Sequence, residues 1–247
     1  MGELVLGIET SNPSAGGAGV AMVRAGGDAA RPWAGEVLGR VLVDDGGAGR
    51  HGDGLMAAID RVVALSGVER GSIGRVAVSA GPGGFTGLRV ACVTGQMLAM
   101  ALGAGAVRVP TVAAVVAGLL DRGVVRDGEA VAVVLASKGE RAFAGVMRAT
   151  GAGVARGDVL GEGHVDAAGF ASLLSAHGVG TVAVDRFVPG AFVAAAAERG
   201  ARVVEPVYDA ALVAGLGGVM GVVEAGALVP MYAREPEAVR LLRGRGG

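Results

Sequence analysis

The sequence predicts an α/β protein built from two halves with the same order of elements. Its 247 residues suffice for one large or two small domains, and 52% of them are hydrophobic, which provides a sizeable core. Gly accounts for 47 residues and aromatic residues for only 3%, so Ala, Val and Leu must fill closely packed layers. Short apolar runs alternate with longer helical patterns, which is typical of α/β proteins.

The first half is expected to have the order βββαβαβα. Three strand-like runs, over residues 4–9, 18–23 and 36–43, are separated by residues that favour turns. Apolar residues then recur at helical spacing from Leu55 to Val63, in a helix that ends near Gly67. The remaining elements are a strand over 75–79, a helix over 86–102, a strand over 106–109 and a helix over 111–121.

The second half is expected to repeat this order. It has strands over 131–135 and 142–148, a weaker strand over 156–160, and a helix over 166–176, followed by a strand over 181–184, a helix over 189–199, a strand over 202–204 and a helix over 208–224. Without obvious sequence identity between the halves, this is the pattern of a duplicated domain. We expect domains over 1–108 and 109–225, a tail over 226–247, and a cleft between the halves.

Charge and composition disfavour direct binding of nucleic acid. The net charge is −1, the isoelectric point is near 6.3, and few aromatic residues are available for base stacking. We expect contact with RNA to be indirect. Four arginines near the C-terminus, Arg234, Arg240, Arg243 and Arg245, more often form a solvated end than an RNA hook.

The remaining composition indicates a cytoplasmic protein. Cys92 is the only cysteine, which excludes an internal disulfide and fits a reducing compartment. Glu3 and Glu9 flank the first apolar run, so this run resembles a strand rather than a signal peptide. The uncharged stretch over 90–107 approaches the length of a membrane span, but its Gly residues and small side chains disfavour insertion.

A glycine-rich segment, GPGGFTG, links a predicted strand to a predicted helix at residues 81–87. Its glycines permit positive φ, Pro82 constrains one turn, and Thr86 is a candidate helix N-cap. Such a loop at a helix N-terminus can bind anions, yet a tight turn without a ligand explains it equally well. The segment matches neither a Walker loop nor a dinucleotide-binding pattern.

The longer string GPGGFTGLR, followed by an apolar helix containing Gly95-Gln96, resembles the signature of the TsaB (YeaZ) family, usually GPGSFTGxR. Gly84 is the single departure. The opening LGIETSNPSAGGAGVAMV and the closing VPMYAR at 229–234 also resemble that family's segments. The resemblance implies two actin-like (ribonuclease H-like) halves, each with a mixed five-stranded sheet flanked by helices.

The same resemblance implies a function in tRNA modification. Members are non-catalytic scaffold subunits that bind TsaD in the complex forming N6-threonylcarbamoyladenosine (t6A37) in tRNAs that read codons beginning with A. The expected partners are a TsaD-type protein, a TsaE-type ATPase, and a second copy of the chain when it is alone. Contact with tRNA would be indirect, no membrane would be involved, and ATP and Mg would be bound only by the assembled complex.

Two carboxylates that actin-like ATPases use are altered in this chain. Glu9 stands where the usual residue is Asp, and Leu135 replaces the second Asp. A lone carboxylate cannot position both magnesium and a nucleophile. We therefore interpret one set of residues as a vestigial phosphate loop: Glu9, Thr10, Ser11, Gly81, Gly83 and Thr86. The alternative, a small actin-like kinase or ATPase, requires a second carboxylate that the sequence does not place.

No catalytic or metal-ligating residue is predicted. None of His51, His164 and His177 is paired at helical spacing, and a peptidase-like or secretion-chaperone protein of this fold would need such a pair or a signal segment. His51 occupies a family-matched position of unknown role, near a helix start where Asp53 suits the helix dipole. Cys92 and Ser79 lack an adjacent base, so we expect them to serve packing.

The helix over 86–102 is apolar on nearly every side and therefore needs cover from both its own sheet and another helix. In the family this helix and the preceding one pair with TsaD or with a second copy. The predicted partner interface comprises His51, Leu55, Met56, Ile59, Val63, Arg89, Val90, Val93 and Met97. Charge substitutions at Met97 or Ile59 are expected to impair partner binding before they unfold the monomer.

Overall fold

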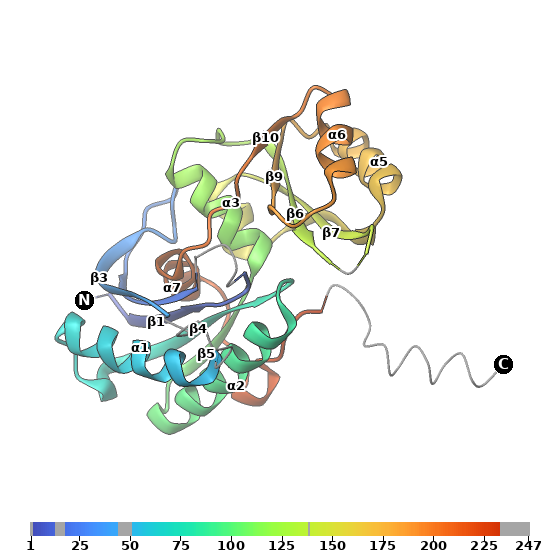
Figure 1. Cartoon of the computed structure of the whole chain (residues 1–247). Helices are drawn as coiled ribbons and strands as arrows, with labels where there is room; N and C mark the ends of the chain where they lie inside the picture. Colours follow the sequence, from blue (N-terminus) through green and yellow to red (C-terminus); the bar gives the residue numbers. More distant parts are fainter. Residues whose placement is uncertain (1, 13–17, 44–50, 138, 233–247) are drawn as a thin grey trace.

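The structure is a computed structural model that describes residues 2–12, 18–43, 51–137 and 139–232 (Figure 1). It confirms the predicted α/β fold with two halves. Each half contains one mixed five-stranded sheet, and helices lie on both faces of each sheet.

The two sheets have the same topology. The first has the order β3-β2-β1-β4-β5, and the second has the order β10-β9-β6-β7-β8. In each sheet the first three strands in the chain pair antiparallel and the last two continue in parallel. The strands are β1 (Leu4–Glu9), β2 (Gly19–Ala25), β3 (Gly35–Leu42), β4 (Ile73–Gly81), β5 (Gly105–Pro110), β6 (Ala130–Ala136), β7 (Ala142–Arg148), β8 (Val159–Val165), β9 (Thr181–Val184) and β10 (Arg202–Val204).

The helices and sheets form five layers. Two helices cover the outer face of the first sheet, two lie between the sheets, and two cover the outer face of the second sheet (Figure 1). In chain order the helices are α1 (His51–Ser66), α2 (Phe85–Leu102), α3 (Thr111–Asp121), α4 (Gly151–Arg156), α5 (Ala167–His177), α6 (Gly190–Glu198) and α7 (Ala210–Val219). Short 3₁₀ turns occur at Arg70–Ser72 and Ala225–Ala227.

The alternation of side chains along each central strand divides the core. Along β6, Val131 and Val133 face the middle layer, whereas Ala132 and Val134 face α5 and α6. Along β1, Val5 faces the middle layer and Leu6 faces α1 and α2. Both central strands are therefore buried on two sides, which explains their continuous apolar runs.

The middle layer consists mainly of α3 and α7, which pack between the two sheets, and the short α4 packs there against α3 and β7. Although α7 lies near the C-terminal end of the described chain, it contacts β1, β2 and β4 of the first sheet. It comes very close to β1, because a Cβ added at Gly7 would lie 2.2 Å from the Ala210 carbonyl oxygen. The second half thus contributes a helix to the core of the first.

Three differences from the predicted elements concern helices. The helix α2 begins at Phe85 with Gly84 as its N-cap, so Thr86 lies inside the helix. The helix expected over 208–224 ends at Val219, because the next residues form a backbone bridge in which Val223 N donates to Ala106 O at 2.8 Å. The third difference is α4, which was not expected. Because α4 extends to Arg156, the strand that was expected over 156–160 begins only at Val159.

A local capping interaction explains α4. The Thr150 hydroxyl accepts a hydrogen bond from Gly153 N at 3.0 Å and caps the helix, and Gly157 closes it in the left-handed conformation. The helix contains two glycines, which lower helix propensity, so its sequence alone did not reveal it.

Candidate functional site

A cleft lies between the two halves, at the carboxyl ends of parallel strands from both sheets. Residues following β1 and β4 come from the first half, and the last residues of β6 and residues following β9 come from the second. Ligands of open α/β sheets bind at such edges. The cleft holds a pocket of about 220 Å³ lined by Ser11, Asn12, Pro82, Gly83, Gly84, Leu135, Ala136, Asp185, Phe187 and Tyr208.

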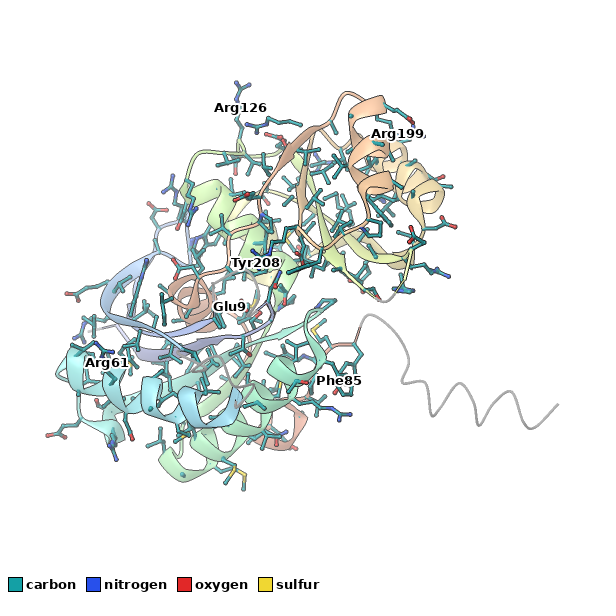
Figure 2. The ribbon with its side chains drawn as sticks, viewed as in Figure 1. Glu9, Arg61, Phe85, Arg126, Arg199 and Tyr208 are labelled. Carbon is teal, nitrogen blue, oxygen red and sulfur yellow. The ribbon has the colours of Figure 1, made fainter. Side chains whose placement is uncertain are left out.

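Three polar side chains connect the halves across this cleft. Asn12 Nδ2 donates to Asp185 Oδ2 at 2.8 Å and to the Tyr208 hydroxyl oxygen at 3.2 Å. The second Asp185 oxygen accepts a hydrogen bond from Phe187 N at 3.1 Å. Tyr208 precedes α7 and lies between the halves (Figure 2). Burial raises the pKa of Tyr208, so its hydroxyl stays protonated at neutral pH.

Glu9 lies at the end of β1 and is only 1% exposed. One carboxyl oxygen, Oε1, accepts a hydrogen bond from Ser11 N at 2.6 Å, whereas Oε2 has no partner. Burial raises the pKa of Glu9, and the hydrogen bond from the Ser11 N–H only partly opposes this effect. Burial therefore biases this carboxyl toward its protonated form.

The raised pKa of Glu9 predicts a pH-dependent cost to stability. Between the ordinary value of 4.5 and the raised folded value, the folded chain keeps a proton that the unfolded chain has released, so stability falls as pH rises. Glu9→Gln removes this loss. We expect its melting temperature to exceed that of the wild type by at least about 2–4 °C at pH 7–8, with the difference vanishing near pH 4.

Thermal unfolding followed by circular dichroism checks this prediction. Glu162→Gln, at an exposed position of β8, is the matched control and should follow the wild type at every pH. A difference for Glu9→Gln that does not change with pH would contradict the prediction.

The glycine-rich loop packs directly on the segment after β1. Gly84 N donates to Ser11 O at 2.7 Å, and the Thr10 hydroxyl donates to Gly87 O at 2.9 Å. A Cβ at Gly83 would lie 2.4 Å from Ser11 O, and one at Gly87 would lie 2.4 Å from Thr10 O. At both positions any larger side chain would collide with the neighbouring backbone, so this close packing explains why glycine occurs there.

The residues of the predicted phosphate loop do not form one open cradle. Glu9, Thr10 and Ser11 are buried, Gly81 has φ of 115° and lies against Met231 O, and Thr86 is an exposed helix residue. No phosphate-binding arrangement needs to be invoked for their positions. Whether the loop contacts an anion stays a prediction.

Asp185 is the functional candidate that the sequence analysis missed. Leu135, at the position of the expected carboxylate, is buried with Val131 and Val133 in the middle layer. The carboxylate comes instead from the neighbouring strand, where Asp185 follows β9 and its N–H donates to Val134 O at 3.0 Å. The sequence signal that could have identified Asp185 was its position directly after a buried parallel strand.

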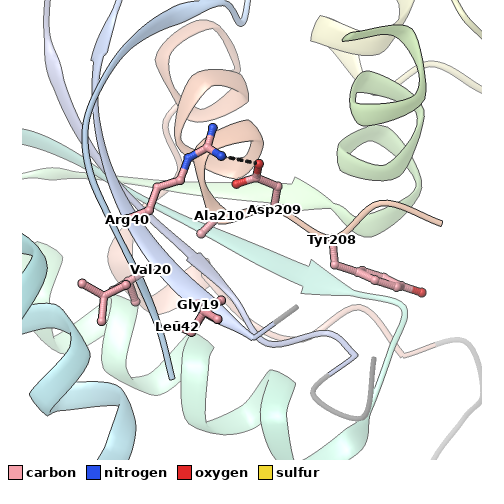
Figure 3. A pocket seen from close by; sticks show the side chains of 8 residues that line it. Gly19, Val20, Arg40, Leu42, Tyr208, Asp209 and Ala210 are labelled. Atoms are coloured by element: carbon pink, nitrogen blue, oxygen red, sulfur yellow. Dashed lines mark ion pairs between the residues drawn. The ribbon is translucent and has the colours of Figure 1, made fainter. Parts of the chain in front are cut away.

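A second pocket lies beside Tyr208, over β2 and β3 of the first sheet (Figure 3). There Arg40 of β3 pairs with Asp209 at 3.2 Å. The Asp209 side chain also accepts a hydrogen bond from Ala211 N at 2.8 Å and caps α7. These contacts hold the start of α7 against the sheet. Arg40 and Asp209 therefore have a structural function in this pocket.

The three histidines and the cysteine lie on four different elements. His51 begins α1, and its side chain lies outside the described residues. His164 Nε2 lies 2.8 Å from the Ser137 hydroxyl, and His177 ends α5. Among the described residues no group of three His, Cys, Asp or Glu is arranged to hold a metal ion.

Cys92 and Ser79 are packing residues in this structure. Burial raises the pKa of the Cys92 thiol to about 12, which leaves little reactive thiolate at neutral pH. The buried Ser79 hydroxyl lies 3.1 Å from that of Thr111.

The predicted partner interface divides into a buried and an exposed set. Leu55, Ile59 and Val63 are buried in the core between α1 and the first sheet, so the structure contradicts their assignment to the surface. The helical period explains the error, since it identifies an apolar face without saying whether the sheet or a partner covers it. The exposed members are Met56, Arg89, Val93 and Met97, whereas Val90 is half-buried.

An aromatic cluster adjoins this exposed set at the start of α2. The Arg89 guanidinium lies 3.9 Å from the centroid of the Phe85 ring, and its Nε donates to the Tyr232 hydroxyl at 2.8 Å. The Phe85 and Tyr232 rings are also in contact, tilted by 33° with centroids 5.4 Å apart. Together with Met231 N, which donates to Ala80 O, these contacts hold the described part of the tail against α2 and β4. The four C-terminal arginines lie outside the described residues.

Comparison with known proteins agrees with this geometry. Residues 46–185 match the family described as TsaD: tRNA N6-adenosine threonylcarbamoyltransferase. YeaZ from Pseudomonas aeruginosa has a similar structure, with a TM-score of 0.67, 19% identity, and coverage of 93% of this chain and 99% of that chain. No curated protein matches the chain.

A further crystal structure, described as an uncharacterized protein with similarity to peptidase YEAZ from Pseudomonas aeruginosa, gives a TM-score of 0.68 at 19% identity. It covers 94% of this chain and 100% of that chain. At these identities the two structures establish the shared fold.

Proposed function

The chain belongs to the TsaD family of tRNA N6-adenosine threonylcarbamoyltransferases, as a member of the TsaB (YeaZ) type, and from this premise we propose that it is the non-catalytic partner subunit that binds a TsaD-type protein. In this function it supports the formation of N6-threonylcarbamoyladenosine in tRNAs that read codons beginning with A. The chain would contact tRNA only through its partner. A TsaE-type ATPase, a homodimer of the free chain, and a cytoplasmic location are further parts of the proposal.

The observation that carries this proposal is the exposed apolar stripe of α2. Val93, Met97 and Met100 are 53%, 67% and 73% exposed, and their spacing places them on one side of the helix. Met56 of α1 is also exposed, and α1 and α2 lie side by side on the outer face of the first sheet (Figure 1). Exposed apolar side chains grouped on neighbouring helices mark interaction surfaces.

A membrane is a weaker candidate for covering this stripe. By length and composition α2 could span a membrane, with a mean hydropathy of 1.3 over 18 residues. However, α2 connects the parallel strands β4 and β5 and buries Leu88, Ala91 and Cys92 against the sheet. To cross a bilayer it would have to leave the sheet, and the core would lose those contacts. A protein partner can cover the stripe without this loss.

The cleft supports a non-catalytic function. Glu9 is buried with one oxygen unpaired, and the position of the second usual carboxylate is the buried Leu135. None of the described lining residues is a Lys, Arg or His that could neutralise a phosphate. An ATPase of this fold needs charges arranged around a metal-bound nucleotide, and this pocket presents a different arrangement.

One observation favours the alternative of a small-molecule kinase or ATPase. Asp185 supplies a second carboxylate to the cleft, which the sequence did not place. A kinase reaction would bring this carboxylate near a substrate hydroxyl as a base. The alternative is separated from the main proposal by incubating the isolated chain with ATP and Mg²⁺ and measuring the release of ADP.

Reconstitution tests the main proposal. We expect the chain to co-elute with a TsaD-type protein as a heterodimer, and we expect formation of threonylcarbamoyladenosine by the purified components to fall at least about tenfold when the chain is omitted. The isolated chain should release no ADP above background. Separate elution together with unchanged modification in its absence would overturn the proposal, as would sustained ADP release from the chain alone.

A further inference from the structure

The pocket between the halves has a chemistry that the partner function does not explain. Its described lining combines apolar side chains, Pro82, Leu135 and Phe187, with polar groups of Ser11, Asp185 and Tyr208. Its volume of about 220 Å³ is below the range of about 300–1,000 Å³ that is usual for drug-sized ligands. The space therefore suits a small group or a single side chain.

Most hydrogen-bond donors around the pocket are already engaged. Asn12 uses its amide on Asp185 and Tyr208, Gly84 N is bonded to Ser11 O, and Phe187 N is bonded to Asp185. What remains is the acceptor capacity of the Asp185 carboxylate together with the Ser11 and Tyr208 hydroxyls, each of which can accept or donate a hydrogen bond. The Asp185 carboxylate is therefore the group that favours a ligand with donors.

Two buried polar atoms at the pocket are unpaired. Ser11, which lines the pocket, is 1% exposed, and its hydroxyl has no partner. Beneath it, Ser11 N binds Glu9, and the second oxygen of that buried carboxyl is also unpaired. Unpaired buried polar groups are costly, and a bound ligand is one way to satisfy them.

Charge decides between an anionic and a cationic ligand. Asp185 is the one acidic residue among the described lining residues, and no described cation lines the pocket to balance it. The nearby Arg186 stacks over the Phe187 ring, with 4.7 Å to its centroid, and is not among the lining residues. A phosphate would be repelled here, whereas a cation would be attracted.

We propose that the pocket binds a small organic cation, an alkylguanidinium or alkylammonium group, with its charge on Asp185, an N–H directed to the Ser11 hydroxyl, and its stem against Leu135 and Phe187. A planar guanidinium can bind a carboxylate with two parallel hydrogen bonds, and its apolar stem can pack on apolar walls. A metal ion fits less well, because the described residues offer no group of three His, Cys, Asp or Glu ligands.

The test is an NMR titration of the full chain with propylguanidinium, propylammonium and inorganic phosphate in separate arms. Both cations should give saturable shifts of the backbone amides of Ser11, Asn12 and Ala136, and phosphate should give none. Asp185→Asn should weaken the cation Kd at least about tenfold, because the charge-assisted hydrogen bonds are lost. Asp158→Asn, at an exposed carboxylate paired with Arg156, is the matched control and should bind like the wild type.

A second variant keeps the test decisive if Asp185→Asn is unstable. Ala136→Leu fills the pocket without changing charge, and it should also abolish the saturable shifts while thermal unfolding confirms a folded chain. A fourth arm with the peptide acetyl-Gly-Arg-Gly-amide separates the two sources of the cation. Tighter binding of the peptide identifies an arginine side chain of another protein, and binding of the small cations alone identifies a metabolite.

The proposal is overturned by any of three results. Absence of saturable shifts with both cations would show that the pocket does not bind them. Saturable phosphate binding that becomes stronger in Asp185→Asn would identify an anion site. Cation shifts of equal size in Asp185→Asn and Asp158→Asn would show non-specific binding. None of these results bears on TsaD binding, because that proposal depends on the exposed stripe of α2.

Discussion

Met97→Glu is expected to weaken binding of a TsaD-type protein by about 30- to 100-fold, which corresponds to about 2–3 kcal/mol. Met97 is 67% exposed in the centre of the apolar stripe, between Val93 and Met100. A carboxylate at this position would have to lose its hydration when the interface closes, and no described neighbour on the stripe is a cation except Arg89, which is engaged with Tyr232. Titration calorimetry with the purified partner measures the change.

The matched pair Val93→Glu and Val193→Glu controls for the added charge. Both valines are exposed helix residues, but Val193 lies on α6 of the second half, away from α2. We expect Val93→Glu to weaken binding and Val193→Glu to leave it unchanged, with both chains as stable as the wild type. Equal affinities for both variants would remove α2 from the interface.

Ile59 is not a suitable position for testing partner binding. It is 4% exposed and packs with the core of the first half, so a charge there would unfold the chain rather than separate it from a partner. This corrects the expectation that substitutions at Met97 and Ile59 would act alike.

Gly7→Val is expected to remove at least about 3 kcal/mol of folding stability, a large part of the total of about 5–15 kcal/mol that is typical of native proteins. The added Cβ would lie 2.2 Å from Ala210 O and 2.6 Å from Ala214 N, so it would meet the backbone of α7 rather than a movable side chain. Gly7 is also fixed in the sheet between Ala21 of β2 and Ala77 of β4. The helix would have to leave the sheet and expose the middle layer.

Gly26→Val is the control for this substitution, because no atom lies within 4 Å of an added Cβ at that exposed position. Urea unfolding followed by circular dichroism should show a midpoint close to that of the wild type for Gly26→Val and a midpoint at least about 1 M lower for Gly7→Val. Similar midpoints for the two variants would mean that α7 does not pack on β1 as described.

Much of the fold could be predicted because local patterns identify strands and helices. The bounds of β1, β7, β9, β10 and α3 agree with the expectations, since apolar runs of strand length ended at turn-forming residues. The failures occurred where a side-chain cap, as in α4, or a distant strand, as at Val223, determined the backbone. Such contacts leave little trace in a short window of sequence.

The candidate site was predicted less well, because it is assembled from distant segments. Glu9 and the glycine-rich loop could be identified along the chain, but their close packing through Thr10 and Ser11 could not. Asp185 lies 173 residues from Asn12, its hydrogen-bond partner, and an expectation centred on position 135 overlooked it.

By itself the sequence determined the order of elements, the duplicated topology and the family, because these depend on local periodicity and on contiguous motifs. Only the tertiary structure decided which apolar residues of α1 are buried, that α7 crosses to the first sheet, and that Asp185 completes the cleft. The physical reason is that a side chain's environment depends on which elements pack against it. A helical period shows that Ile59 and Met97 are apolar, but the position of the sheet makes one a core residue and leaves the other for a partner.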